Sequence, residues 1–231
     1  MNVVITGASQ GIGYGIAKKF AEAGANLFLC SRNMDKLANW QLEMMAKYNI
    51  TISSFNANLS RKEEVAAFSE AVLSAWDRID ILVNNAGSFV PGSVYNEPEG
   101  NLEKMIELNL YSAYHLTRKL LPVMMAAKSG HVFNMCSVAA LQAYPAGGSY
   151  SISKYALQGF SKNLREEMKN FGIKVTSVHP GATFTAAWEG FAERSRIMEV
   201  TDIADLIFAA SKLSPNACVE DILVRPQLGD L

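Results

Sequence analysis

The sequence predicts an α/β protein with one doubly wound, seven-stranded parallel sheet that carries helices on both faces. Three observations lead to this fold class. Short apolar runs rich in β-branched residues alternate with longer helical stretches along the whole chain. A glycine-rich turn follows the first run and opens the first helix. The 231 residues fit a single domain with a sizeable core, since 49% of them are hydrophobic.

The expected elements follow in order along the chain. Strands are expected at Val3–Thr6, Leu27–Ser31, Thr51–Phe55, Ile81–Asn84, His131–Met135, Lys174–Val178 and Val219–Val224. Helices are expected at Gly11–Gly24, Asp35–Tyr48, Lys62–Trp76, Leu102–Ala127, Ser149–Phe171 and Thr201–Leu213. Right-handed crossovers then bring the carboxyl ends of all strands to one edge of the sheet, where ligands bind. Residues from about 182 to 200 lack a clear pattern and are expected to form a substrate flap.

Composition narrows the class of partner. Lys and Arg total 21 against 22 Asp and Glu, and no basic stripe suggests a nucleic-acid surface. Cys30, Cys136 and Cys218 lie far apart without a paired spacing, which favours reduced thiols and assigns no metal site. The chain opens directly into a strand-like run, and no segment has the ~18 uninterrupted apolar residues of a membrane helix. We therefore expect a cytoplasmic protein without a membrane partner.

The first turn, Thr6–Gly13, has the spacing of a phosphate-binding loop. Gly7 permits a tight turn, Gly11 lets the backbone approach a pyrophosphate, and Gly13 lets the helix pack closely on the strand. The helix N-terminus offers free N–H groups and the positive end of its dipole. Turns use glycine for ordinary structural reasons too, but the position between the first strand and first helix favours a dinucleotide.

The end of the second strand indicates which dinucleotide binds. An acid that grips the ribose 2′-OH is expected about 20 residues after the turn. Ser31, Arg32 and Asn33 stand there instead. Arg32 can pair with a 2′-phosphate and stack on adenine, so NADP(H) is favoured over NAD(H). The alternative is a solvated surface arginine.

Three further residues suggest a catalytic group. Tyr150 and Lys154 are four residues apart on an expected helix and so share a face. Ser137 follows a strand at the ligand-binding edge. Each of these is common by itself, and only the combination with the glycine-rich turn is informative.

In this combination the chain resembles the short-chain dehydrogenase/reductase family over essentially its whole length, which implies a single Rossmann domain. The matching segments are Thr6–Gly13, Asn84–Gly87, Asn109, Ser137, Tyr150–Lys154 and Pro180–Gly181. The resemblance implies that Tyr150 gives its proton to a carbonyl oxygen, with its pKa lowered from about 10 to about 7 by Lys154 and the oxidised nicotinamide. It implies that Ser137 hydrogen-bonds the substrate oxygen.

The resemblance also implies a role for Asn109, which would hold a water linking Lys154 to solvent. The alternative is a buried asparagine satisfied by backbone groups. Asn58 stands where the family commonly has Asp and is expected to accept from the adenine amino group. The turn and the resemblance together give the expected cofactor contacts: Gly7, Ser9, Gln10, Gly11, Ile12, Gly13, Ser31, Arg32, Asn58, Leu59, Asn84, Ala86, Gly87, Tyr150, Lys154, Pro180, Gly181, Thr183 and Thr185.

The substrate pocket is expected in the loops after Asn84–Gly87, Ser137 and Gly181. Its expected lining residues are Phe89, Tyr144, Phe184 and Trp188. This aromatic lining suits a hydrophobic carbonyl compound. Alternatively, Trp188 and Phe191 only pack the flap onto the body.

The expected activity is NADPH-dependent reduction of a ketone or aldehyde. The ending Val219–Pro226, together with the segment Pro180–Trp188, resembles sepiapterin-reductase-like carbonyl reductases. A reductase of oxoacyl groups on acyl carrier protein is the main alternative, although its docking arginines are missing around Lys128 and Phe171. A non-catalytic NADP(H) sensor is the alternative from another class, although such proteins usually lose the tyrosine or lysine.

The resemblance also suggests a homodimer or homotetramer, because the equivalents of helices Leu102–Ala127 and Ser149–Phe171 form a four-helix interface in the family. The apolar residues on these helices either serve that interface or face the sheet of their own subunit. They are Ala113, Leu116, Leu120, Leu157, Phe160 and Leu164.

Overall fold

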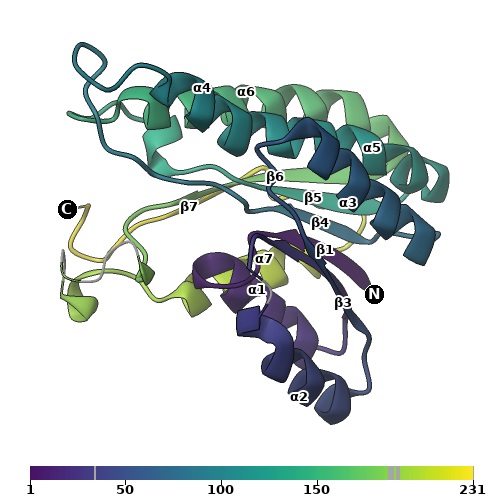
Figure 1. The fold of residues 1–231 in the computed structure, drawn as a ribbon. Coiled ribbons are helices and arrows are strands. Elements are labelled where there is room, and N and C mark those ends of the chain that lie inside the picture. The colour runs from purple at the N-terminus through teal and green to yellow at the C-terminus, as the bar shows by residue number, and fades with distance from the viewer. Residues whose placement is uncertain (34, 187–189, 191–192, 231) are drawn as a thin grey trace.

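Seven parallel strands form one sheet in the order β3-β2-β1-β4-β5-β6-β7 (Figure 1). The computed structural model describes residues 1–231 except 34, 187–189, 191–192 and 231. The strands are β1 (Asn2–Thr6), β2 (Asn26–Ser31), β3 (Ile52–Asn56), β4 (Ile81–Asn84), β5 (Gly130–Met135), β6 (Ile173–Pro180) and β7 (Asp221–Val224). The predicted seven-stranded parallel sheet is therefore confirmed.

Helices cover both faces of the sheet (Figure 1). One layer contains α1 (Gly11–Glu22), α2 (Ala38–Tyr48) and α7 (Val200–Ser211). The other contains α3 (Lys62–Ala75), α4 (Asn101–Ile106), α5 (Ser112–Ala127) and α6 (Gly148–Met168). The short helices are η1 (Asp35–Leu37), η3 (Val138–Ala140), η4 (Lys169–Phe171) and η6 (Arg194–Arg196).

The apolar strands form these two layers because successive side chains point to opposite faces. In β1, Val3 and Ile5 join the core under α1 and α7, whereas Val4 joins the core under α3 and α5. All three are fully buried. Strands covered on both sides are continuously apolar, and this is why the sequence shows runs instead of alternation.

One expected helix differs from the prediction. The stretch expected as one helix over Leu102–Ala127 contains a π-helical segment, η2 (Glu107–Tyr111), between α4 and α5. Wider helical turns of this kind occur frequently at functional sites. This one carries Asn109.

Of the two alternatives for the apolar residues on the two long helices, the structure matches packing within their own subunit. Leu116 and Leu120 are fully buried, and Ala113, Leu157 and Leu164 are at most 5% exposed. Phe160 is partly buried against the same cores. Among the described helices, none is long and apolar enough to cross a membrane.

Candidate active site

A cavity of about 590 Å³ opens at the carboxyl edge of the sheet. It is bounded by the β1–α1 turn, the ends of β2, β4, β5 and β6, the start of α6 and the C-terminal segment. The predicted residues that line it are Gly7, Ser9, Gln10, Gly11, Ile12, Ser31, Arg32, Leu59, Ala86, Gly87, Phe89, Ser137, Tyr144, Tyr150, Lys154, Pro180, Gly181, Thr183 and Thr185. Residues far apart in sequence thus meet around one space.

The β1–α1 turn has the geometry of an anion site. Gly7 and Gly11 have φ of +66° and +57°, which other residues adopt only with strain. A Cβ at Gly13 would lie 2.3 Å from the Gly7 carbonyl oxygen, so this glycine acts through close packing and does not line the cavity. The N-cap Gln10 makes no side-chain cap, which leaves the first N–H groups of α1 available to a phosphate.

Cations lie beside this turn. Arg32 lines the cavity, and among the described residues it takes part in no salt bridge. The Lys36 amino group donates to Gln10 Oε1 at 3.4 Å, and the sequence analysis did not include this lysine. The Ser31 hydroxyl donates to Ser9 Oγ at 2.6 Å, joining the end of β2 to the turn. A 2′-phosphate fits this cationic end, and a pyrophosphate fits the adjoining helix N-terminus.

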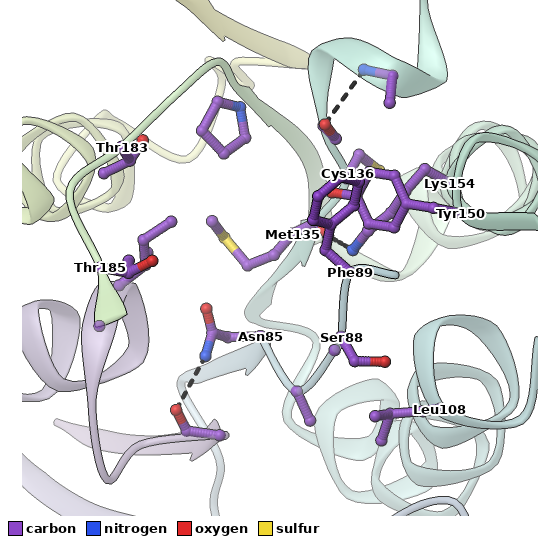
Figure 2. A pocket seen from close by; sticks show the side chains of 18 of the residues that line it. Asn85, Ser88, Phe89, Leu108, Met135, Cys136, Tyr150, Lys154, Thr183 and Thr185 are labelled. Carbon is purple, nitrogen blue, oxygen red and sulfur yellow. Dashed lines mark hydrogen bonds between the residues drawn. The ribbon is translucent and has the colours of Figure 1, made fainter. Parts of the chain in front are cut away.

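Asn85 lines the cavity in place of Asn84. Asn84 is 4% exposed and donates to the side chains of Thr117 and Asn134, each at 2.8 Å, so it lies in the core. Asn85, labelled in Figure 2, instead donates toward the turn. Its Nδ2 donates to the carbonyl oxygens of Thr6 at 2.9 Å and Gly7 at 3.1 Å. The expected cofactor contact of Asn84 is therefore corrected, and its neighbour holds the phosphate-binding turn.

Asn58 also differs from its expected place. Its Oδ1 accepts from the Ser60 N–H at 3.2 Å and the Ser60 hydroxyl at 2.9 Å. The neighbours that line the cavity are Ala57 and Leu59. A side-chain carbonyl already engaged in a local turn is a poor acceptor for an adenine amino group, so the structure does not support that contact.

Lys154 and Tyr150 lie next to each other in the lining of the cavity (Figure 2). The Lys154 amino group donates to the Met135 carbonyl at 2.8 Å and lies 5.7 Å from the centre of the Tyr150 ring. Burial lowers the pKa of Lys154 to about 8. Burial raises the pKa of Tyr150 to about 12, and a hydrogen bond with the Ser137 hydroxyl acts in the opposite direction. The expected lowering of the tyrosine pKa therefore needs a further positive charge beyond the protein's own.

Ser137 lies where β5 gives way to η3. It is 7% exposed, and its Oγ accepts from the Ala139 N–H at 3.1 Å, which caps the short helix. A hydroxyl that accepts from the backbone keeps its own proton for donation. This geometry suits a donor to a substrate oxygen.

Asn109 is satisfied by protein groups. Its Oδ1 accepts from the Ser88 N–H at 2.9 Å, and its Nδ2 donates to the Ser88 carbonyl at 3.1 Å and the Ser153 hydroxyl at 2.9 Å. It is 1% exposed and does not line the cavity. The side chain therefore matches the alternative of a buried, backbone-satisfied asparagine. It still lies near the site, because a Cβ at Gly87 would be 3.0 Å from Asn109 Oδ1 and 3.5 Å from Lys154 Nζ.

The expected aromatic pocket is only partly formed. Phe89 packs edge-on against Tyr150, with ring centres 4.8 Å apart (Figure 2). Both Phe89 and Tyr144 line the cavity. Phe184 does not line it, because its ring lies against the Arg194 guanidinium at 4.8 Å. Trp188 and Phe191 lie outside the described residues.

The C-terminal segment adds lining residues that sequence reasoning missed. Arg225 and Asp230 line the cavity and form a salt bridge with each other. A Cβ at Gly181 would lie 2.7 Å from Asp230 Oδ1, so this glycine admits the segment. Arg196 also holds the C-terminal segment, because its guanidinium donates to the Gly229 carbonyl at 2.9 Å. No local pattern in the sequence signals such a long-range contact. Sequence reasoning also missed other residues that line the cavity, namely Cys30, Ser88, Leu108, Met135, Cys136, Val138, Ala139, Ala182 and Ala186.

Comparisons with known proteins agree with this geometry. A family model described as short chain dehydrogenase matches residues 1–195. An uncharacterized oxidoreductase of Staphylococcus epidermidis is 31% identical over 225 residues, which cover 96% of each chain. A metagenomic short-chain oxidoreductase in complex with NADP has a TM-score of 0.85 at 33% identity, covering 98% of this chain and 97% of that one. L-sorbose reductase from Gluconobacter frateurii, complexed with NADPH and L-sorbose, has a TM-score of 0.90 at 27% identity, covering 96% and 94%.

Proposed function

This chain belongs to the short-chain dehydrogenase family, and from that premise we propose that it is an NADP(H)-dependent reductase of a ketone or aldehyde. One observation carries the proposal. Ser137, Tyr150 and Lys154 line one end of a cavity whose other end holds the glycine-rich turn and Arg32. A reducible carbonyl compound and a phosphorylated dinucleotide can therefore bind next to each other in one cavity.

The choice of NADP(H) is supported by charge. Arg32 lines the cavity at the end of β2, Lys36 lies beside the same turn, and no acid stands at the position that would grip a 2′-OH. The NADP complexes among the related structures are consistent with this choice. The α1 N-terminus would hold the pyrophosphate, and Lys154 would hold the nicotinamide ribose.

When bound, NADPH would supply the hydride, and the chain's own residues would transfer the proton and stabilise the charge. With its pKa raised to about 12, Tyr150 carries its proton at neutral pH and can give it to the substrate oxygen. Lys154 is positively charged below a pKa of about 8 and stabilises the phenolate that remains. Ser137 donates a hydrogen bond to the same oxygen as negative charge develops there.

The substrate is expected to be a small carbonyl compound of the kind that sepiapterin-reductase-like enzymes reduce. Phe89 and Tyr144 offer apolar surface at the reactive end. Among the described residues, the charged side chains lining the cavity are Arg32, Lys154, Arg225 and Asp230. The last two neutralise one another, so apart from Lys154, which stabilises the phenolate, the described lining offers no unpaired charge at this end, and a carbonyl compound without net charge suits it.

An oligomer is also proposed, as a homodimer or homotetramer. Its interface would use outward-facing apolar residues instead of those first considered. On the outer surface of η2 and α6, Tyr111, Ile152 and Tyr155 are between 42% and 48% exposed.

A screen of carbonyl compounds tests the proposal. Purified protein is mixed with NADPH and, separately, with a pterin ketone, diacetyl, isatin or a 3-oxoacyl thioester, and the loss of NADPH absorbance is followed. We expect turnover with at least one small carbonyl compound and its loss in Tyr150→Phe. Tight NADPH binding without turnover of any compound would contradict a reductase and favour the sensor.

A further inference from the structure

His179 lies beneath the reactive end of the cavity and has no role in the chemistry described above. It is in β6, immediately before Pro180, and its side chain is fully buried. Its Nδ1 lies 3.1 Å from the carbonyl oxygen of Ser137, and its Nε2 lies 2.9 Å from Asp221 Oδ1. The ring therefore bridges the loop of the substrate-binding serine and the first residue of β7.

Both partners of this ring are hydrogen-bond acceptors. A neutral imidazole has a single N–H, so it can donate to the carbonyl or to the carboxylate but not to both. The second nitrogen would then present its lone pair to another oxygen. Only the imidazolium donates at both ends and satisfies both contacts.

The surroundings can compensate the buried positive charge. Burial by itself would raise the pKa of Asp221, but hydrogen bonds from His179 and Gln158 lower it, so the carboxylate is charged. A buried cation is tolerated when it is paired and hydrogen-bonded in this way.

The other ionisable groups near the pair lie on two elements. On α6, Lys162 further favours the charged carboxylate, and Lys154 lies beside Cys136. On the β5 side, burial raises the pKa of the Cys136 thiol to about 12, so the thiol is neutral. Next to Asp221, Glu220 pairs with Arg165. Asp221 is therefore the anion in direct contact with the ring among the described residues.

The carboxylate also contacts the catalytic helix. Gln158 lies one helical turn after Lys154 on α6. Its side-chain amide Nε2 donates to the same Asp221 Oδ1 at 3.2 Å. In the sheet, Asp221 stands opposite Ser177, so His179 is its diagonal neighbour on one face. Asp221 thus joins β7, α6 and, through the imidazole, the Ser137 loop.

We propose that His179 is an imidazolium held by Asp221, and that this pair positions Ser137 against Tyr150 by fixing the serine's main-chain carbonyl. The pair acts through Ser137 and touches no reacting atom, so both are positioning residues. The effect of the pair on catalysis rests on the role proposed above for Ser137. The protonation state of His179 and its contact with the Ser137 loop do not depend on that role.

Nuclear magnetic resonance tests the pair without any turnover. Nitrogen-15 spectra at neutral pH should show both ring nitrogens of His179 protonated in the wild type and one of them deprotonated in Asp221→Asn. His115 and His131, the other two histidines, are assigned by substitution. The amide signals of Ser137 and Ala139 should shift in Asp221→Asn and stay in place in Glu220→Gln, a matched neighbour that loses only a surface ion pair. A neutral wild-type ring, or an unmoved Ser137 loop, would overturn the proposal.

Kinetics tests the consequence. The Asp221 side chain is 49% exposed, so Asp221→Asn should fold. Displacing a positioned group can cost up to about 100-fold, and we expect kcat to fall about 10- to 100-fold while the Kd for NADPH stays unchanged. Glu220→Gln should retain wild-type kcat. A normal kcat in Asp221→Asn, with the nitrogen spectra as expected, would overturn the positioning role. If the wild type shows no turnover, that result counts against the proposed reductase function. The nitrogen-15 spectra still test the His179–Asp221 pair in that case.

Discussion

The amino group of Lys154 donates to the main-chain carbonyl of Met135 at 2.8 Å, which fixes the catalytic helix to the end of β5 two residues before Ser137. This bond uses one of the three ammonium donors and holds the amine beneath the Tyr150 ring. The relative placement of the lysine, tyrosine and serine is therefore built into the protein before any ligand binds.

Removing the Tyr150 hydroxyl should stop the chemical step and spare cofactor binding. Tyr150→Phe keeps the ring and its edge-on contact with Phe89. Loss of a positioned general acid costs about 10²–10⁴-fold in kcat. The Kd for NADPH should stay close to wild type. Tyr95→Phe, at a position that is 87% exposed and outside the cavity lining, is the control and should be fully active. Near-normal turnover in Tyr150→Phe would exclude the proposed mechanism.

The rate should depend on pH through Lys154. Burial lowers the pKa of this lysine to about 8, so the positive charge is present below that pH and lost above it. The quantity kcat/KM for NADPH reports the free enzyme, and we expect it to fall by up to about tenfold per pH unit above this value. Tyr150, with its pKa raised to about 12, should not titrate in the same range. In Lys154→Ala the residual activity should lack this decrease. A wild-type profile that stays flat through the range would contradict the assignment.

Arg32 should set the cofactor preference. Arg32→Asp replaces a cation by an anion at the 2′-phosphate end, so NADPH should bind about 10- to 100-fold more weakly, as expected for a lost charged hydrogen bond. NADH should improve relative to NADPH. Lys36→Ala removes the neighbouring cation and should give a smaller loss of the same sign. Measured kcat/KM values for both cofactors check this. If the wild type has equal kcat/KM for NADH and NADPH, Arg32 has no such role.

Reduction should not depend on a carrier protein. Lys128 ends α5 before β5, and Phe171 stands, 39% exposed, before β6, where an acidic carrier would require cations. Oxoacyl groups on acyl carrier protein should react no faster than small-molecule thioesters at equal concentration. A large rate advantage for the protein-bound substrate would instead identify an oxoacyl-carrier reductase.

The sequence by itself determined the order of strands and helices, the phosphate-binding turn and the cation at the end of β2. These features depend on local periodicity, on the positive φ of Gly7 and Gly11, and on one residue type at one position. The four-residue spacing of Tyr150 and Lys154 likewise needs only a helix to place them on one face. Local rules act over a few residues, and the sequence displays such rules directly.

The tertiary structure decided where side chains point when distant partners compete for them. Asn84 faces the core because Thr117 and Asn134 bond it there, and Asn85 takes the place at the turn. The approach of Arg225 and Asp230 to the cavity, and of Asp221 to His179, depends on where β7 and the chain end lie. A hydrogen bond between residues 33 to 79 positions apart leaves no period in the sequence, because its partners are brought together only by the packing of the whole sheet.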